Sequence, residues 1–211
     1  MRLTVFGASG ATGTCLVEQA VAAGHEVTAV VRDPARLSRM PQPGARIVTA
    51  DVMDPAAIAA VIAGTGAVLS AVGPRGTGPG TVVQDSARSI ASAMRRSGPA
   101  RLLIISGSIV TDAGEGAVMS HLIKPLARAA MLRHVCADMR QAEDEIRASG
   151  LDWTIMRPPR LTGKPAAGSY RTAIDRNLPR GLTISRADLA ACMLALISDR
   201  AAVHRHVAIA S

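Results

Sequence analysis

The feature that most constrains the fold of this chain is a glycine loop at residues 7–13, with the sequence G-A-S-G-A-T-G. It follows an apolar run, Leu3–Phe6, that indicates a strand, and it precedes a segment with the apolar spacing of a helix. In a strand–turn–helix unit of this kind, the first glycine permits a tight turn and the second lets the backbone approach a pyrophosphate. The third glycine lets helix and strand pack closely.

The position of this loop favours a dinucleotide site over the alternative, a tight turn that binds nothing. The N–H groups at the start of the helix would face the anion. The residues expected to hold the pyrophosphate are Gly7, Ser9, Gly10, Ala11, Thr12 and Gly13.

Strand-like and helix-like segments alternate along the 211 residues, which predicts an α/β fold. We expect a Rossmann-type, doubly wound parallel sheet of about seven strands in a single domain, residues 1–211, with a small substrate-side C-terminal portion. The expected strands are Leu3–Phe6, Glu26–Val31, Arg46–Ala50, Ala67–Val72, Arg101–Ser106, Trp153–Met156 and Val203–Ala210. The expected helices begin near Thr12, Pro55, Thr81, Arg133 and Ser185.

Three irregular segments would leave the carboxyl edge of this sheet, where open α/β sheets bind their ligands. They are Gly73–Gly80, Gly107–Gly116 and Pro158–Arg180. Because loops at this edge often carry function, we expect the three segments to wall the substrate site.

The composition argues against nucleic-acid and membrane proteins. The net charge is +8, but the basic residues are dispersed, and Phe6, Trp153 and Tyr170 are the only aromatic residues available for base stacking. We interpret the charge as steering for an anionic cofactor. No apolar run is long enough to cross a bilayer, and we expect no signal peptide before the first strand. Three scattered cysteines without a C-x-x-C pair indicate reduced thiols, so we expect a cytoplasmic protein.

The end of the second strand is where such folds select their cofactor. An acidic residue there binds the ribose 2′-hydroxyl of NAD, whereas a basic residue accepts the 2′-phosphate of NADP. The sequence has Arg32 at this point and Arg36 four residues later, with Asp33 as a counter-signal. Two solvated arginines are the alternative, but the pattern favours NADP(H), with both arginines on the 2′-phosphate.

Further residues are expected along the cofactor. Asp51 and Val52 close the third strand and should lie by the adenine, whereas Asp54 is better explained as a helix cap before Pro55. Gly73 ends the fourth strand where backbone must pass close to the cofactor. Arg75 would reach the pyrophosphate or an anionic substrate, or it would be a solvated loop arginine.

Several stretches of the chain resemble those of a known family. The stretches G-A-S-G-A-T-G, H-E-V-T-A-V-V-R-D-P-A-R-L, A-D-V-M-D and R-P-P-R-L-T-G look like those of the atypical short-chain dehydrogenase/reductase superfamily, which includes NmrA-like proteins. The Pro158-Pro159 pair and Gly168-Ser169-Tyr170 resemble the NADPH-dependent flavin reductase and biliverdin-IXβ reductase group. The resemblance runs nearly end to end. It implies hydride transfer from NADPH to a flavin or a linear tetrapyrrole by a compact monomer.

One pattern of the wider superfamily is missing. Members that act on alcohols and ketones use a Tyr-x-x-x-Lys pair, in which the lysine lowers the tyrosine pKa for proton transfer. Here Ile174, not a lysine, stands four residues after Tyr170. In the helix where the pair would fall, Val135 and Met139 occupy the two positions. Ordinary ketone reduction is therefore not expected, whereas a flavin can take hydride and draw its proton from solvent.

The resemblance also assigns residues to the acceptor side. Two adjacent hydroxyl residues are common after the fifth strand; Ser106 matches the first, Gly107 replaces the second, and Ser108 is a substitute if the loop shifts. We expect Ser106 and Ser108 to bond nicotinamide or acceptor, unless they bond only backbone. Pro158 and Pro159 would wall the nicotinamide. Arg160 stands where the reductases carry a histidine, which favours an anionic acceptor such as a flavin phosphate.

Two other clusters are not expected to carry chemistry. His204 and His206 share one face of a strand, but no third ligand with suitable spacing accompanies them, so we predict no metal site. The run Glu143–Glu145 lies near arginines on a helix and is expected to be a solvated face.

The sequence thus predicts an NADPH-dependent reductase of a flavin-like or tetrapyrrole-like acceptor. The alternative is a non-catalytic, NmrA-like NADP sensor that acts through protein partners.

Overall fold

The computed structural model describes residues 1–36, 44–74, 76–98, 101–111, 113–114 and 132–211. Its large sheet has eight strands in the order β3-β2-β1-β4-β5-β6-β10-β8. All neighbours run parallel except β8, which pairs antiparallel with β10. The strands of this sheet are β1 (Arg2–Phe6), β2 (Glu26–Val31), β3 (Ala45–Thr49), β4 (Ala67–Ser70), β5 (Arg101–Ile105), β6 (Asp152–Arg157), β8 (Arg171–Ile174) and β10 (Arg205–Ala210).

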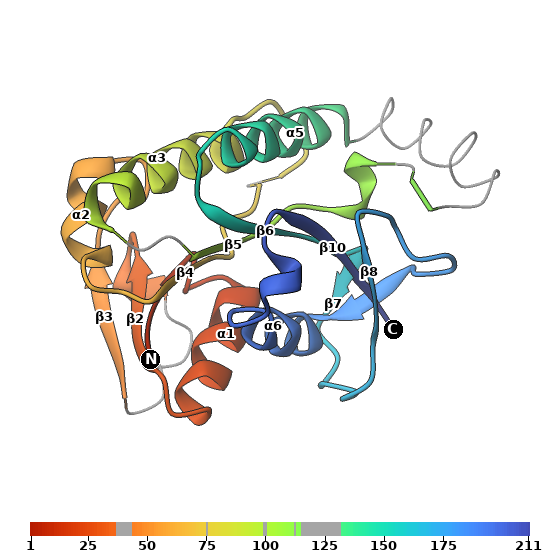
Figure 1. Ribbon diagram of the computed structural model, residues 1–211, viewed down its shortest axis with the longest axis horizontal. Coiled ribbons are helices and arrows are strands. Elements are labelled where there is room, and N and C mark those ends of the chain that lie inside the picture. Colours follow the sequence, from red (N-terminus) through yellow and green to blue (C-terminus); the bar gives the residue numbers. More distant parts are fainter. Residues whose placement is uncertain (37–43, 75, 99–100, 112, 115–131) are drawn as a thin grey trace.

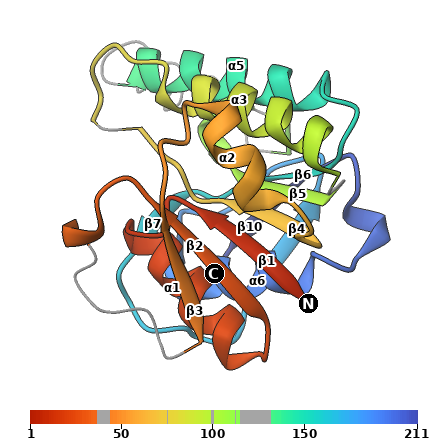
Figure 2. The ribbon, with the colours of Figure 1, turned by 90° about the vertical axis from the view of Figure 1, so that its left-hand side faces the viewer.

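Helices cover both faces of the sheet (Figure 1). The helices α1 and α6 pack together on one face, and α2, α3 and α5 form a layer on the other, as the view turned by 90° makes plain (Figure 2). In the described part of the chain, the helices are α1 (Ala11–Ala22), α2 (Pro55–Ile62), α3 (Val82–Ser97), α5 (Arg133–Arg147) and α6 (Arg186–Ala195). No helix there is both long and apolar enough to cross a membrane.

The two hydrophobic cores follow from the alternation of side chains along buried strands. In β1, Leu3 and Val5 join the core under α1 and α6, whereas Phe6 joins the core under α2, α3 and α5. Because both faces of the parallel sheet are covered, β1 and β4 are buried almost throughout. The predicted cap at α2 is confirmed: Asp54 accepts hydrogen bonds from two N–H groups of the first turn, directly before Pro55.

The predicted doubly wound fold is confirmed, and all seven expected strands are present with small shifts at their ends. The sheet has eight strands where about seven are expected, because β8 extends its edge beside β10. A second, two-stranded sheet joins β7 (Arg160–Thr162) to β9 (Thr183–Ser185). Thus the segment Pro158–Arg180, expected to be irregular, contains two short strands: β7 in the second sheet and β8 at the edge of the large sheet.

Candidate functional site

The glycine loop turns sharply between β1 and α1, and two of its glycines are sterically required. Gly7 has φ +70°, and a Cβ there would lie 2.8 Å from the backbone carbonyl of Ala71. A Cβ on Gly13 would lie 2.7 Å from the carbonyl carbon of Gly7, closer than nonbonded carbons approach. These contacts let α1 begin directly beside the end of β1, as the sequence predicted for the first and third glycines.

The start of α1 is suited to an anion. Gly10 is the N-cap residue, is exposed, and donates its N–H to the carbonyl of Gly7 at 2.9 Å. The N–H groups of the first turn, which includes Ala11, Thr12 and Gly13, have no partner within the helix. The first turn carries no acidic side chain, so nothing there opposes a negative ligand.

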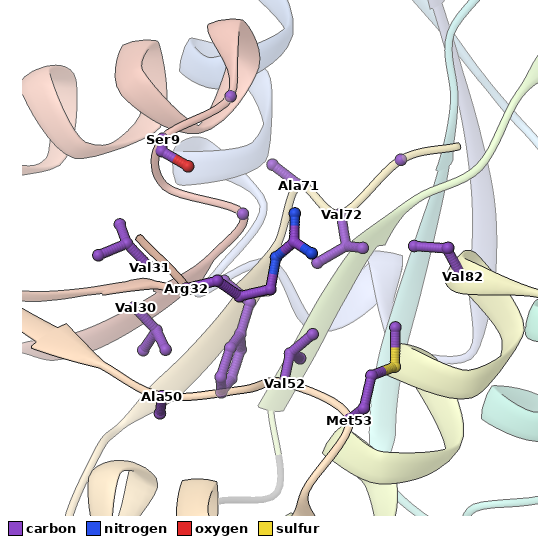
Figure 3. Close-up of a pocket in the computed structure, with 14 residues that line it drawn as sticks. Ser9, Val30, Val31, Arg32, Ala50, Val52, Met53, Ala71, Val72 and Val82 are labelled. Atoms are coloured by element: carbon purple, nitrogen blue, oxygen red, sulfur yellow. The ribbon is translucent and has the colours of Figure 1, made fainter. Parts of the chain in front are cut away.

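A pocket of about 480 Å³ opens beside this turn, a volume typical of small-molecule sites. It is bounded by the ends of β1, β2 and β4, by the residues after β3 and by the start of α3. Apolar side chains contribute about half of its wall, among them Val30, Val52, Met53 and Val82 (Figure 3). Such a wall can pack against the faces of a planar, uncharged ring such as adenine.

Of the charged side chains that follow β2 and β3, one lines the pocket and two accept hydrogen bonds from nearby backbone N–H groups. Arg32 lines the pocket and extends between the Ser9 turn and Ala71 (Figure 3). Asp33 does not line it, because its carboxylate accepts a hydrogen bond from the N–H of Ala35 at 3.0 Å. Asp51, expected by the adenine, likewise accepts from the N–H of Met53 at 3.0 Å and stays outside the lining.

The other expected cofactor residues are placed as follows. Ser9, Gly10 and Gly73 line the pocket together with Val52, as their assignment requires. Arg36 ends the 3-10 turn η1 (Pro34–Arg36). Arg75 lies outside the described residues.

The residues expected on the acceptor side lie at the ends of β5 and β6, beyond the lining of the 480 Å³ pocket. The N–H of Ser108 donates to the carbonyl of Pro158 at 2.8 Å, which ties the two strand ends together. Pro158 is buried and Pro159 half-buried, and Arg160 is exposed at the start of β7.

Gly107 stands where related reductases carry a hydroxyl residue, and Met139 stands where they carry the lysine of the pair. These two residues lie next to each other. A Cβ on Gly107 would lie 3.3 Å from the sulfur of Met139 on α5, so this contact is apolar. Tyr170, the only tyrosine, lies near Cys192 of α6; burial and this neighbour raise its pKa. Neither place offers the acidic phenol of a tyrosine–lysine pair.

Ser106 makes a different contact from the one expected. Its hydroxyl is buried under α5 and donates to Oε1 of Glu143 at 2.7 Å. Arg157, the last residue of β6, donates Nε to the same oxygen at 3.0 Å and Nη2 to Oε2 at 2.5 Å. The expectation that Glu143 belongs to a solvated face is therefore wrong: its exposed fraction is 1%, and only its neighbours Asp144 and Glu145 face outward.

Comparison with known proteins identifies the family. The family model described as NAD(P)H-binding matches residues 7–200. The chain belongs to this NAD(P)H-binding family. An uncharacterised chloroplastic protein of Arabidopsis thaliana is 32% identical over 195 residues, which cover 88% of this chain and 68% of that protein.

Solved structures show the same fold at low sequence identity. The oxidoreductase ylbE of Lactococcus lactis superposes with a TM-score of 0.84 at 16% identity, covering 100% of this chain and 91% of the other. A short-chain dehydrogenase/reductase of Veillonella parvula in complex with NADP gives 0.80 at 14%, covering 100% and 94%. The anaerobilin reductase ChuY of Escherichia coli O157:H7 gives 0.76 at 23%, covering 100% and 97%. These structures show the shared fold, and the family model confirms the expected NAD(P)H-binding family.

Two buried polar residues of this NAD(P)H-binding protein hold loops at Ala167–Gly168 and Ser108–Thr111, and neither was predicted from the sequence. Asp188 on α6 accepts from the N–H groups of Ala167 and Gly168, each at 3.0 Å. Asn177 donates to the carbonyls of Ser108 (2.9 Å) and Thr111 (3.0 Å). A signal existed for Asp188, since Ser185 three residues earlier gives the S-x-x-D spacing of a helix N-terminus. Asn177 gives no comparable signal.

The histidine pair lies near the Glu143 cluster. His204 and His206 both contact the ring of Trp153, at centroid distances of 5.8 and 5.2 Å. His206 lies 3.6 Å from Glu143 Oε2 and 3.5 Å from Asp175. Burial lowers the pKa of His206, and the charge of Arg157 acts in the same direction, which favours a neutral ring. Among the described residues, no group of three or more potential ligands could hold a metal ion.

Proposed function

We propose that this protein is an NADPH-dependent reductase that transfers hydride to a planar, electron-poor acceptor. A flavin is the first candidate acceptor and a linear tetrapyrrole the second. The observation that carries the cofactor choice is the division between Arg32, which lines the pocket, and Asp33, whose carboxylate is engaged by the N–H of Ala35. A cation without a competing carboxylate suits a 2′-phosphate better than a 2′-hydroxyl.

The residues of this chain fit each part of such a cofactor. The glycine loop and the start of α1 bind the pyrophosphate, Arg32 binds the 2′-phosphate, and Val52 and Met53 pack on the adenine. When bound, the nicotinamide supplies the hydride. The protein aligns the two rings and excludes water from between them.

Two features favour a flavin-like or tetrapyrrole-like acceptor. Gly107 and Met139 offer no proton at the place where a ketone reductase needs one, whereas a reduced flavin can take its proton from water. In addition, the segment from Pro158 to Leu182 carries five basic residues and one acidic residue. Within this segment, Arg160 is exposed at the start of β7, and its guanidinium suits an acceptor with phosphate or carboxylate groups. The anaerobilin reductase among the structural neighbours agrees with this choice.

The decisive experiment measures NADPH oxidation by the purified protein with FMN, biliverdin and a quinone as separate acceptors. An NADH arm and an enzyme-free blank accompany each. Turnover with a preference for NADPH is the expected result. Tight NADPH binding without oxidation of any acceptor would contradict the proposal. It would support the second candidate, an NADP-binding sensor, which the apolar Gly107–Met139 contact also permits.

We further propose that the protein is a monomer in a reducing compartment such as the cytosol, where its three thiols stay reduced.

A further inference from the structure

A buried carboxylate connects the ends of two neighbouring strands. Glu143 on α5 accepts from Ser106, which directly follows β5, and from Arg157, which ends β6. The exposed fractions of the three residues are 1%, 4% and 9%. The N–H of Ser106 also donates to the carbonyl of Met156 at 2.8 Å. The carboxylate therefore fixes where these two strands end.

The segments that follow these strand ends are those assigned to the nicotinamide and the acceptor. Gly107 and Ser108 follow Ser106, and Pro158 and Pro159 follow Arg157. A displacement of Glu143 would thus move both segments together. A displacement of about 1 Å at reacting groups can cost about 100-fold in rate.

Stability alone does not account for the ion pair. Removing two charges from water costs free energy that their attraction only partly returns, so a buried pair often stabilises no more than apolar side chains of the same volume. What the pair supplies is geometry, because the planar guanidinium donates to both oxygens of one carboxylate.

We propose that Glu143 is a positioning residue: through Ser106 and Arg157 it holds the two strand ends that flank the nicotinamide. This role rests on the proposed reductase function. Glu143 does not touch the reacting atoms. Ser106 acts with it, because its hydroxyl bonds the carboxylate rather than the ligand.

The double variant Glu143→Met/Arg157→Met tests this role without leaving a buried charge unpaired. We expect its unfolding temperature and its Kd for 2′,5′-ADP, which reports only the adenosine half of the site, to match the wild type. The fluorescence of bound NADPH should lose the enhancement that a fixed nicotinamide gives. With FMN, kcat should fall at least about tenfold while the KM for NADPH changes little.

Ser106→Ala provides a second variant that keeps the ion pair and the fold. Its matched control is Ser86→Ala, which removes a buried hydroxyl of α3 that bonds the carbonyl of Val83 and not the carboxylate of Glu143. We expect Ser106→Ala to lower both kcat and the NADPH emission, and Ser86→Ala to change neither.

Three results would overturn the role of Glu143. The first is bound-NADPH emission in the double variant equal to that of the wild type. The second is an unchanged kcat in a folded double variant, and the third is an equal loss of emission in Ser86→Ala. An inactive wild type that binds NADPH would instead refute the reductase function. The emission comparison would still decide whether Glu143 positions the nicotinamide.

Discussion

Arg32 lines the pocket beside the glycine loop, whereas the carboxylate of its chain neighbour Asp33 accepts a hydrogen bond from the N–H of Ala35 at 3.0 Å. The two charged residues are adjacent in sequence, but their side chains make different contacts. The acidic side chain closes a local turn, and the basic one remains for a ligand. Within the described residues, Arg32 has no ion-pair partner that a 2′-phosphate would have to displace.

The first prediction concerns Arg32→Ala. We expect the Kd for NADPH to rise about 10- to 100-fold, since a hydrogen bond to a charged group contributes about 1.5–3 kcal/mol. The Kd for NADH should change little, because NADH lacks the 2′-phosphate. Fluorescence titration of both cofactors measures the two constants. Arg95→Ala, an exposed arginine on α3, is the control and should bind both cofactors as the wild type does. Equal losses for NADPH and NADH would remove Arg32 from the 2′-phosphate site.

The second prediction concerns the glycine loop. Gly13→Ala forces a Cβ against the carbonyl of Gly7, so the loop or α1 must shift. We expect dinucleotide binding to fall below detection and the free energy of unfolding to drop by about 1–3 kcal/mol. Calorimetry of NADPH binding and urea denaturation measure the two effects. Gly78→Ala, where a Cβ meets nothing within 4 Å, is the matched control. Normal NADPH affinity in Gly13→Ala would show that the loop does not hold the pyrophosphate.

Local sequence signals predicted the glycine turn and the segments around the pocket. The glycine loop, Arg32 and the Asp54 cap each depend on a few neighbouring residues, and the structure places each one in the expected element. The short strands β7, β8 and β9 were missed because long-range pairing creates them. In β8, for example, Ile174 pairs with Val207, thirty-three positions later in the numbering.

The buried Glu143 was missed for a related reason. Glu143, Asp144 and Glu145 are consecutive, and successive helical residues point about 100° apart, so the first and third of them point in very different directions. The spacing from Met139 to Glu143, four residues, placed Glu143 on the inner stripe of the helix. Its partners Ser106 and Arg157, however, come from two strands that only the folded sheet brings beneath α5.

The third prediction concerns Asp188, which anchors the loop at Ala167 and Gly168. Burial opposes its ionisation, but hydrogen bonds from Ser185 and from these two N–H groups outweigh burial and lower its pKa. Its ionised form therefore stabilises the folded state above about pH 3.9, the ordinary value in an unfolded chain. This stability is lost as the pH falls through the lowered folded-state pKa.

Asp188→Asn should accordingly be less stable than the wild type at pH 6, by about 1–3 kcal/mol, because Asn cannot accept all three hydrogen bonds as well. The difference should shrink at pH 3. Urea denaturation at both pH values measures it, with Glu26→Gln, an exposed carboxylate at the start of β2, as the control. A difference that is the same at both pH values would mean that the charge of Asp188 contributes nothing.

The fourth prediction concerns Arg160, which is exposed at the start of β7 and makes no ion pair within the described residues. If its guanidinium meets a negative group of the acceptor, Arg160→Ala should raise the KM for FMN about tenfold or more. The KM for lumiflavin, which has the same ring without the phosphate, should stay near the wild-type value. Steady-state kinetics at saturating NADPH measures both. Arg95→Ala again serves as the control, since it removes one positive charge far from the carboxyl edge. If FMN and lumiflavin respond alike to Arg160→Ala, the acceptor phosphate lies elsewhere, and the basic segment between Pro158 and Leu182 acts only through long-range attraction.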